Sequence, residues 1–212
     1  MQEDGDGFSP ASVMTIHKEA AASQRAKSRI NLVLLVDGSS SVTEEDFRTM
    51  KDFCKNLVRS MEETHKDSSI ALVQFNQLSR VEIAMRGLHA SEEHPLSAYE
   101  EIENIKQLMG STELYAPINS ARKILAELDD NAGRNVVCML SDGQTHTTEL
   151  DKAAEEAKAL RDLYGATLFA LGVGRDVDEQ GLGRLLKSAC VMDDGPLEYG
   201  SYFCLRKMKN RG

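Results

Sequence analysis

The chain has 212 residues, in which 25 lysines and arginines stand against 34 aspartates and glutamates, giving a formal net charge of −9. This acidity argues against nucleic acid and against an anionic membrane surface as partners, because both repel a negatively charged protein. No apolar run approaches the ~20 residues that cross a bilayer, so direct membrane insertion is not expected, and residues 1–28 lack the apolar stretch of a signal peptide.

The first part of the chain predicts a polar tail, a strand and a helix. Residues 1–28 are polar and predict an N-terminal tail, in which residues 10–28 are compatible with a short helix. Residues 30–36 form a continuous apolar run that predicts a buried parallel strand. From a cap at Thr43, apolar residues then recur at helical spacing as far as Met61.

The remainder alternates strands and helices. Residues 70–75 predict a second buried strand, and residues 81–85 an antiparallel edge strand that returns from it. Further helices are predicted at 98–108, from Pro117 to Leu128, at 150–160 and at 178–189. Further strands are predicted at 136–140, at 166–173 and near 202–205, before a basic C-terminal tail at 207–212. This alternation predicts an α/β fold with a mostly parallel, doubly wound sheet covered on both faces and one antiparallel edge strand.

Four cysteines are spread along the chain without a Cys-x-x-Cys pair, so a zinc site is not expected. Cys54 falls in a predicted helix and Cys138 in a predicted buried strand, where each would serve as a small hydrophobic side chain. Cys190 and Cys204 could pair in an oxidising compartment or stay as free thiols. The absence of any Asn-x-Ser/Thr acceptor site favours an intracellular location, with an extracellular or cell-surface domain as the alternative.

Carboxylate and hydroxyl side chains follow two predicted strands and precede one predicted helix. They are Asp37, Ser39, Ser41, Thr112 and Asp142. The carboxyl ends of parallel strands meet at one edge of a sheet, where α/β folds bind ligands, so these side chains are expected to lie close together. All of them are hard oxygen donors, which suit Mg²⁺ or Mn²⁺ and not a soft metal.

The pattern formed by these residues resembles that of a known family. Its parts are Asp37-x-Ser39-x-Ser41, then Thr112 in a loop with a glycine, then Ser141-Asp142-Gly143. Together they resemble the metal-ion-dependent adhesion site of von Willebrand factor type A domains. The stretches 71–75 and 168–174 are also similar to that family, and the resemblance extends over residues 29–206.

The resemblance implies a fold, a cofactor and a partner. The fold would be a Rossmann-like, three-layer α/β/α arrangement. The cofactor would be Mg²⁺ or Mn²⁺, held by the oxygen donors named above, some of them through water. The domain would be a non-enzymatic adhesion or complex-assembly module, whose metal ion is completed by a Glu or Asp of a partner protein.

Some classes of enzyme also place functional residues directly after the first strand of an α/β sheet. A Mg²⁺-dependent phosphotransferase of the haloacid dehalogenase type would use Asp37 as its nucleophile. That class needs an acid where this chain has Ser39, and a lysine near the later acidic loop, but none lies between Ser141 and Leu150. No P-loop motif is present, and the first strand is not followed by a dinucleotide-binding glycine pattern. The sequence therefore favours a binding module, either an adhesion ectodomain or an intracellular assembly subunit.

Overall fold

The computed structural model describes residues 29–129, 133–145 and 147–189. Several expected features lie outside these residues: the N-terminal tail, the strand near 202–205, the basic tail at 207–212, Cys190 and Cys204. Within the described part, no helix is both long enough and apolar enough to cross a membrane.

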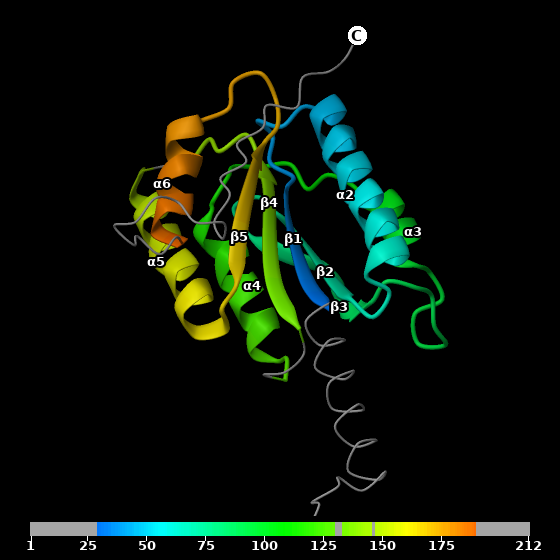
Figure 1. Ribbon diagram of the computed structural model, residues 1–212. Helices are drawn as coiled ribbons and strands as arrows, with labels where there is room; N and C mark the ends of the chain where they lie inside the picture. Colours follow the sequence, from blue (N-terminus) through cyan, green and yellow to red (C-terminus); the bar gives the residue numbers. More distant parts are fainter. Residues whose placement is uncertain (1–28, 130–132, 146, 190–212) are drawn as a thin grey trace, which may run out of the picture.

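A five-stranded sheet forms the centre of the domain, with the strand order β3-β2-β1-β4-β5 (Figure 1). Its strands are β1 (Ile30–Asp37), β2 (Ser69–Phe75), β3 (Ser79–Gly87), β4 (Arg134–Ser141) and β5 (Thr167–Gly172). β1 pairs in parallel with β2 and β4, and β4 with β5, while β3 runs antiparallel to β2 at one edge. The predicted mostly parallel sheet with one antiparallel edge strand is confirmed.

Helices cover both faces of the sheet and complete the three layers. They are α2 (Glu44–Thr64), α3 (Ala98–Asn104), α4 (Tyr115–Ala126), α5 (Thr147–Tyr164) and α6 (Glu179–Ala189). α2 and α3 pack on one face and α4, α5 and α6 on the other (Figure 1). The helix predicted at 98–108 ends earlier than expected, at Asn104. It stops because the buried side chain of Gln74 donates to the carbonyl of Lys106 at 2.9 Å and accepts from the amide of Leu108 at 2.7 Å, so these backbone groups do not pair within a helix.

β1 supplies the middle of both cores, which explains its continuous apolar run. Leu32 and Leu34 face the layer of α2 and α3, whereas Val33 and Leu35 face the layer of α4, α5 and α6. A strand that is covered on both faces has no solvent side, so polar alternation is absent from it. On the next strand, burial raises the pKa of the Cys138 thiol to about 12, which keeps it neutral as a small core side chain.

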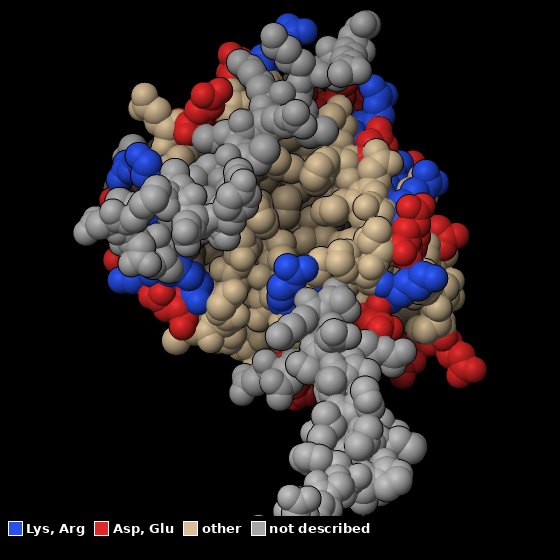
Figure 2. Space-filling model, viewed as in Figure 1, with Lys and Arg blue, Asp and Glu red and all other residues tan. Residues whose placement is uncertain are grey.

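The two faces of β5 are covered unequally. Leu168 and Ala170 are buried in the core under α4, α5 and α6, whereas Phe169 and Leu171, facing the other way, are only partly buried. Figure 2 shows that uncharged side chains occupy the centre of this side, with charged side chains gathered around its margin. The layer of α2 and α3 therefore covers the sheet less completely than the opposite layer.

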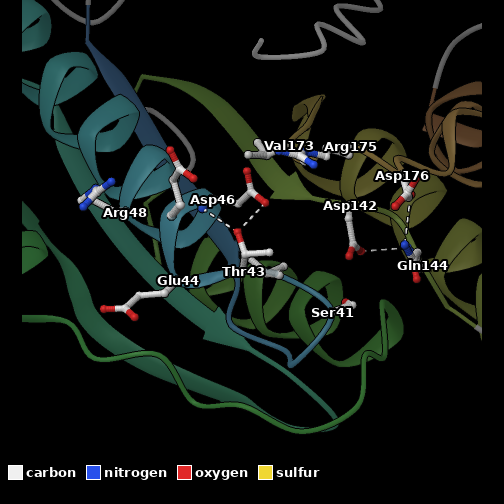
Figure 3. Close-up of a pocket in the computed structure, with 13 residues that line it drawn as sticks. Ser41, Thr43, Glu44, Asp46, Arg48, Asp142, Gln144, Val173, Arg175 and Asp176 are labelled. Carbon is white, nitrogen blue, oxygen red and sulfur yellow. Dashed lines mark hydrogen bonds between the residues drawn. The ribbon is translucent and has the colours of Figure 1, made fainter. Parts of the chain in front are cut away.

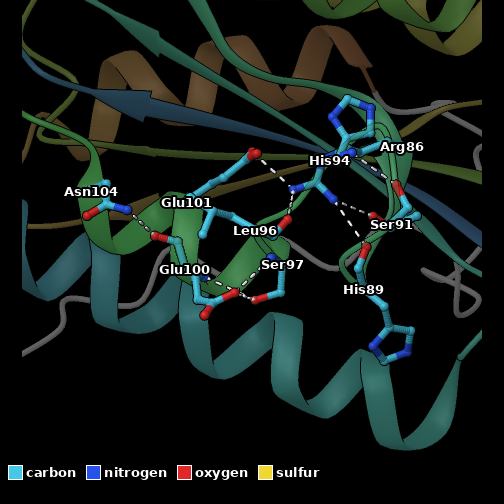
Figure 4. Close-up of polar contacts among 10 residues, drawn as sticks. Arg86, His89, Ser91, His94, Leu96, Ser97, Glu100, Glu101 and Asn104 are labelled. Atoms are coloured by element: carbon cyan, nitrogen blue, oxygen red, sulfur yellow. Dashed lines mark hydrogen bonds and ion pairs between the residues drawn. The ribbon is translucent and has the colours of Figure 1, made fainter.

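The amino edge of the sheet is the end at which its parallel strands begin. There, a compact loop of residues 88–97 closes around Arg86 at the end of β3 (Figure 4). The guanidinium of Arg86 donates to three carbonyl oxygens in and beside this loop, at 3.1 to 3.4 Å. It also forms an ion pair with Glu101 of α3 at 3.1 Å, with only 7% of the arginine side chain exposed. Ser97 then caps α3, and Glu100 completes a capping box. A buried cation thus orders this edge of the molecule.

Candidate metal centre

Three loops meet at the opposite, carboxyl edge of the sheet: residues 38–43 after β1, 105–114 before α4 and 142–145 after β4. Backbone hydrogen bonds join the first two loops directly. The amide of Ser40 donates to the carbonyl of Gly110 at 2.8 Å, and the amide of Met109 donates to the carbonyl of Gly38 at 2.7 Å. The Gly110 amide also donates to the Ser40 hydroxyl at 2.8 Å. These two loops are therefore fixed to each other and not merely adjacent.

Asp37, the last residue of β1, is fully buried and held from two sides. One carboxylate oxygen accepts a hydrogen bond from the Ser39 amide at 2.9 Å, and the other accepts from the Ser141 hydroxyl at 2.6 Å. Burial raises the pKa of Asp37 from 3.8 to about 6, against hydrogen bonds from Ser141 and Ser39 that lower it, and the charge of Asp142 adds to the rise. A cation beside this carboxylate would reverse that shift.

Ser39 and Ser41 bring their hydroxyl groups together in the loop after β1. Their Oγ atoms lie 3.0 Å apart, within hydrogen-bonding distance. Ser39 is buried and Ser41 is exposed. The pair therefore offers oxygen donors that lead from the buried carboxylate of Asp37 towards the surface.

Asp142 follows β4 and is 4% exposed. Its Oδ1 accepts a hydrogen bond from the Gln144 amide at 3.0 Å. Its Oδ2 is buried and has no hydrogen-bond partner. An unpaired buried carboxylate oxygen is unfavourable, because desolvation is not offset by any contact. This oxygen can accept a bond from a metal ion without giving up an existing one, so the donor set fits a divalent cation.

Thr112 lies in the second loop and is partly exposed. Its carbonyl oxygen accepts a hydrogen bond from the Thr145 hydroxyl at 3.3 Å, which links the second loop to the third. The left-handed backbone of this loop falls on Met109 and Gly110, with φ of 63° and 100°. Ser111, beside them, is not among the residues with positive φ.

The structure therefore brings the loops that carry all the predicted donors to one edge of the sheet. Among the described residues, the carboxyl edge included, no three histidine, cysteine, aspartate or glutamate side chains gather closely enough to hold an ion by themselves. An ion at the carboxyl edge would depend on hydroxyl and water ligands beside its two carboxylates. Retaining several waters beside one or two carboxylates is the habit of Mg²⁺.

Comparison with known families decides the family of the chain. The family model described as von Willebrand factor type A domain matches residues 31–197. The chain belongs to the von Willebrand factor type A domain family. The resemblance read from its motifs is thereby confirmed at the level of the family and its fold.

Relatives of this von Willebrand factor type A domain include three proteins that are much longer than this chain. It is 30% identical to cochlin of Bos taurus over 158 residues, which cover 74% of this chain and 27% of cochlin. It is 29% identical to matrilin-1 of Gallus gallus over 171 residues, covering 76% of this chain and 31% of matrilin-1. It is 29% identical to the collagen alpha-6(VI) chain of Homo sapiens over 165 residues, covering 76% and 7%. The chain thus spans less than a third of each of these relatives.

Solved structures share the fold at lower sequence identity. BatB from Bacteroides thetaiotaomicron matches with a TM-score of 0.60 and 15% identity, covering 76% of this chain and 86% of that one. The SpRpn10 VWA domain matches with a TM-score of 0.60 and 12% identity, covering 77% and 83%. At such identities the likeness shows the fold alone.

A groove runs beside the loops of this von Willebrand factor type A domain, between the start of α2 and the segment that follows β5 (Figure 3). Its volume is about 1180 Å³, and Ser41 and Asp142 both line it. Its charged lining consists of Glu44, Glu45, Asp46, Arg48, Asp142, Arg175 and Asp176. Five carboxylates against two guanidinium groups make the groove negative, which raises the local concentration of divalent cations.

The residues that hold the loops in place were not identified from the sequence. They are amide side chains: Gln74, Asn76, Gln77 and Gln107. Gln74 carried one available signal, since it is a polar residue within an otherwise apolar strand, which requires buried partners. Its partners in the loop before α4 lie 32 or more residues away in sequence, so local patterns do not reveal them.

Proposed function

We propose that this domain binds a protein partner through a Mg²⁺ or Mn²⁺ ion. The ion would be held by Asp37, Ser39, Ser41, Thr112 and Asp142, directly or through water. The remaining coordination position would be filled by a Glu or Asp of the partner. The observation that carries the proposal is the Oδ2 atom of Asp142, a buried carboxylate oxygen without a hydrogen-bond partner in a residue that lines the groove.

Charge supports the choice of an acidic partner residue. The two carboxylates equal a divalent ion in formal charge, but each of them also accepts hydrogen bonds from the protein, so the ion keeps a local positive potential that attracts a third carboxylate to an open coordination position. Repulsion between the acidic domain and an acidic partner is screened beyond roughly 8 Å at physiological salt, whereas direct metal contact is not. The family and the relatives that this chain matches support the same class of function, which is protein binding in adhesion or in the assembly of a complex.

Calorimetric titration of the metal-free domain with MgCl₂ and MnCl₂ tests the metal. We expect one site per chain, and loss of at least ten-fold in affinity in Asp142→Asn, because the buried carboxylate oxygen of Asp142 that has no hydrogen-bond partner would become an amide group or lose its charge. Asp176→Asn is the matched control, since Asp176 lines the same groove but is outside the donor set. Equal affinity in Asp142→Asn and the wild type would refute the metal site.

The partner is tested by affinity capture with the wild type and Asp142→Asn as baits, in Mg²⁺ and in EDTA. We expect a protein retained only by the wild type in Mg²⁺, and loss of that binding when one Glu or Asp of the captured protein is changed to Ala. A partner retained equally in EDTA would remove the metal from the interface while leaving a binding domain.

The phosphotransferase alternative is tested separately. Both carboxylate oxygens of Asp37 accept hydrogen bonds in the protein interior. Ser39 stands where the phosphotransferase class has its second acid, and its hydroxyl is hydrogen-bonded to that of Ser41, so no acid is present at that position. We therefore expect no hydrolysis of aryl phosphates in Mg²⁺. Turnover that disappears in Asp37→Asn would instead favour catalysis.

A further inference from the structure

Amide side chains connect β2 and its turn to the loops of the candidate metal centre. Gln74 is fully buried and Asn76 is 8% exposed, although both are polar. Asn76 donates to the carbonyl of Met109, and the Gln77 side chain accepts from the amide of Ser111 at 3.1 Å. These contacts hold the second loop against the end of β2.

Gln107 makes the corresponding contact with the first loop. Its Nε2 donates to the carbonyl of Ser39 and to the carbonyl of Val42, both at 2.9 Å. These carbonyls lie on either side of Ser41, so one side-chain nitrogen closes the segment that presents the two serine hydroxyls. Because Gln107 belongs to the second loop, it also fixes the first loop relative to Thr112.

Gln74 in turn fixes Gln107. Its Oε1 accepts from the amide of Leu108 at 2.7 Å, and its Nε2 donates to the carbonyl of Lys106 at 2.9 Å. The two contacts bracket Gln107 on both sides along the chain. Gln74 also donates to Glu82 of the edge strand at 3.0 Å, so every hydrogen-bonding atom of its amide group has a partner.

We propose that Gln107 and Gln74 are positioning residues that set the metal affinity of this domain without touching the ion. A metal ion requires its oxygen ligands within a few tenths of an ångström of fixed positions, and partners behind the ligands typically change affinity by about 10- to 100-fold. Gln107 supplies that constraint to Ser39 and Ser41, and Gln74 supplies it to Gln107. This inference rests on the proposed metal site.

The test replaces Gln107 by Met, which has similar length and no donor. We expect Mg²⁺ and Mn²⁺ affinity to fall about 10- to 100-fold by calorimetry. The control is Asn31→Leu, because Asn31 is also a buried amide, 1% exposed and bonded to Asn135 at 3.0 Å, but lies at the amino edge of the sheet. We expect the control to lose stability in urea and to keep wild-type metal affinity.

A second readout separates positioning from general destabilisation. Water-proton relaxation of bound Mn²⁺ reports how many waters the ion retains, and we expect more of them in Gln107→Met because water replaces serine oxygens. If Gln107→Met does not fold, Gln74→Met is measured in the same way, with a smaller loss expected. Wild-type affinity and hydration in a folded glutamine variant would overturn this inference alone. Absence of metal binding in the wild type would overturn the proposed function together with it.

Discussion

The two edges of the sheet both bury charge, but only one of them neutralises it from within. At the amino edge, Arg86 faces Glu101 and three carbonyl oxygens, which match its charge although its Nε atom has no hydrogen-bond partner. At the carboxyl edge, Asp37 and Asp142 receive hydrogen bonds from neutral donors. In the described part of the chain, none of the ion pairs includes either aspartate.

The difference is the one expected between a structural charge and a charge that binds the proposed metal ion. A buried charge matched by its own fold holds elements together, and removing its partner is costly. A buried charge that the fold leaves unmatched is destabilising, and it persists where a ligand can match it. The charge at the amino edge is therefore paired within the fold, whereas the charges at the carboxyl edge are available to a ligand. The following measurements test this contrast in order of expected effect.

The largest effect is expected from Arg86→Met. The change leaves Glu101 and the loop carbonyls without their cation, and should lower the free energy of unfolding by about 3 kcal/mol. Urea denaturation measures this loss, and metal affinity should not change. The control is Arg184→Met, whose ion pair with Asp151 is more than half exposed on both sides and should contribute under about 0.5 kcal/mol. Similar losses in the two variants would remove the structural role of the amino edge.

Asp37→Asn should act in the opposite direction on metal-free protein. The amide keeps an acceptor for the Ser39 amide but has no charge to bury, so the free energy of unfolding at pH 7 should rise by about 2 kcal/mol. Mg²⁺ should stabilise the wild type and leave this variant unaffected. A variant less stable than the metal-free wild type would show that the carboxylate is satisfied within the fold.

The pH dependence follows from the same group. The pKa of Asp37 is raised in the folded state to about 6 from 3.8, so the folded protein binds the proton more tightly than the unfolded chain. The stabilisation from that proton is present at low pH and is lost as pH rises through 6. Relative to Asp37→Asn, the metal-free wild type should lose about 1 kcal/mol between pH 5 and pH 7. A difference independent of pH would contradict the raised pKa.

The smallest effect concerns backbone strain at the carboxyl edge. Met109 is the one residue other than glycine with positive φ in the described segments, and its side chain is 51% exposed. Met109→Gly should raise the free energy of unfolding by about 0.5 kcal/mol, because glycine adopts this conformation without a steric penalty. Met109→Ala keeps the Cβ atom and should give no gain. Equal stability of the two variants would show that the loop is unstrained.

The fold was predictable wherever the sequence pattern is local. The apolar run of β1 indicated a strand buried on both faces, and Thr43 marked the start of α2, where its side chain accepts from the Asp46 amide. The loops of the candidate metal centre could be placed together because parallel strands end at one edge. Their placement required only the strand order and not the details of each loop.

The sequence did not predict the contacts that hold those loops. The early end of α3 at Asn104 and the left-handed Met109 are both contacted by side chains from β2 and the turn after it, which are far away along the chain. A helical pattern continued to Leu108, but Gln74 competes for the same backbone groups and prevails. Long-range side-chain contacts of this kind have no local signature, so the positioning residues became visible only in the structure.

Gly38, the second residue of the Asp37-x-Ser39-x-Ser41 pattern, has a consequence for the evolution of such sequences. A Cβ atom at this position would lie 2.2 Å from Oε1 of Gln74, which is already fixed by its hydrogen bonds. In descendants of this chain, position 38 is therefore not free to drift while position 74 stays glutamine. We expect the two positions to change together, so that a side chain at 38 is accompanied by a smaller residue at 74.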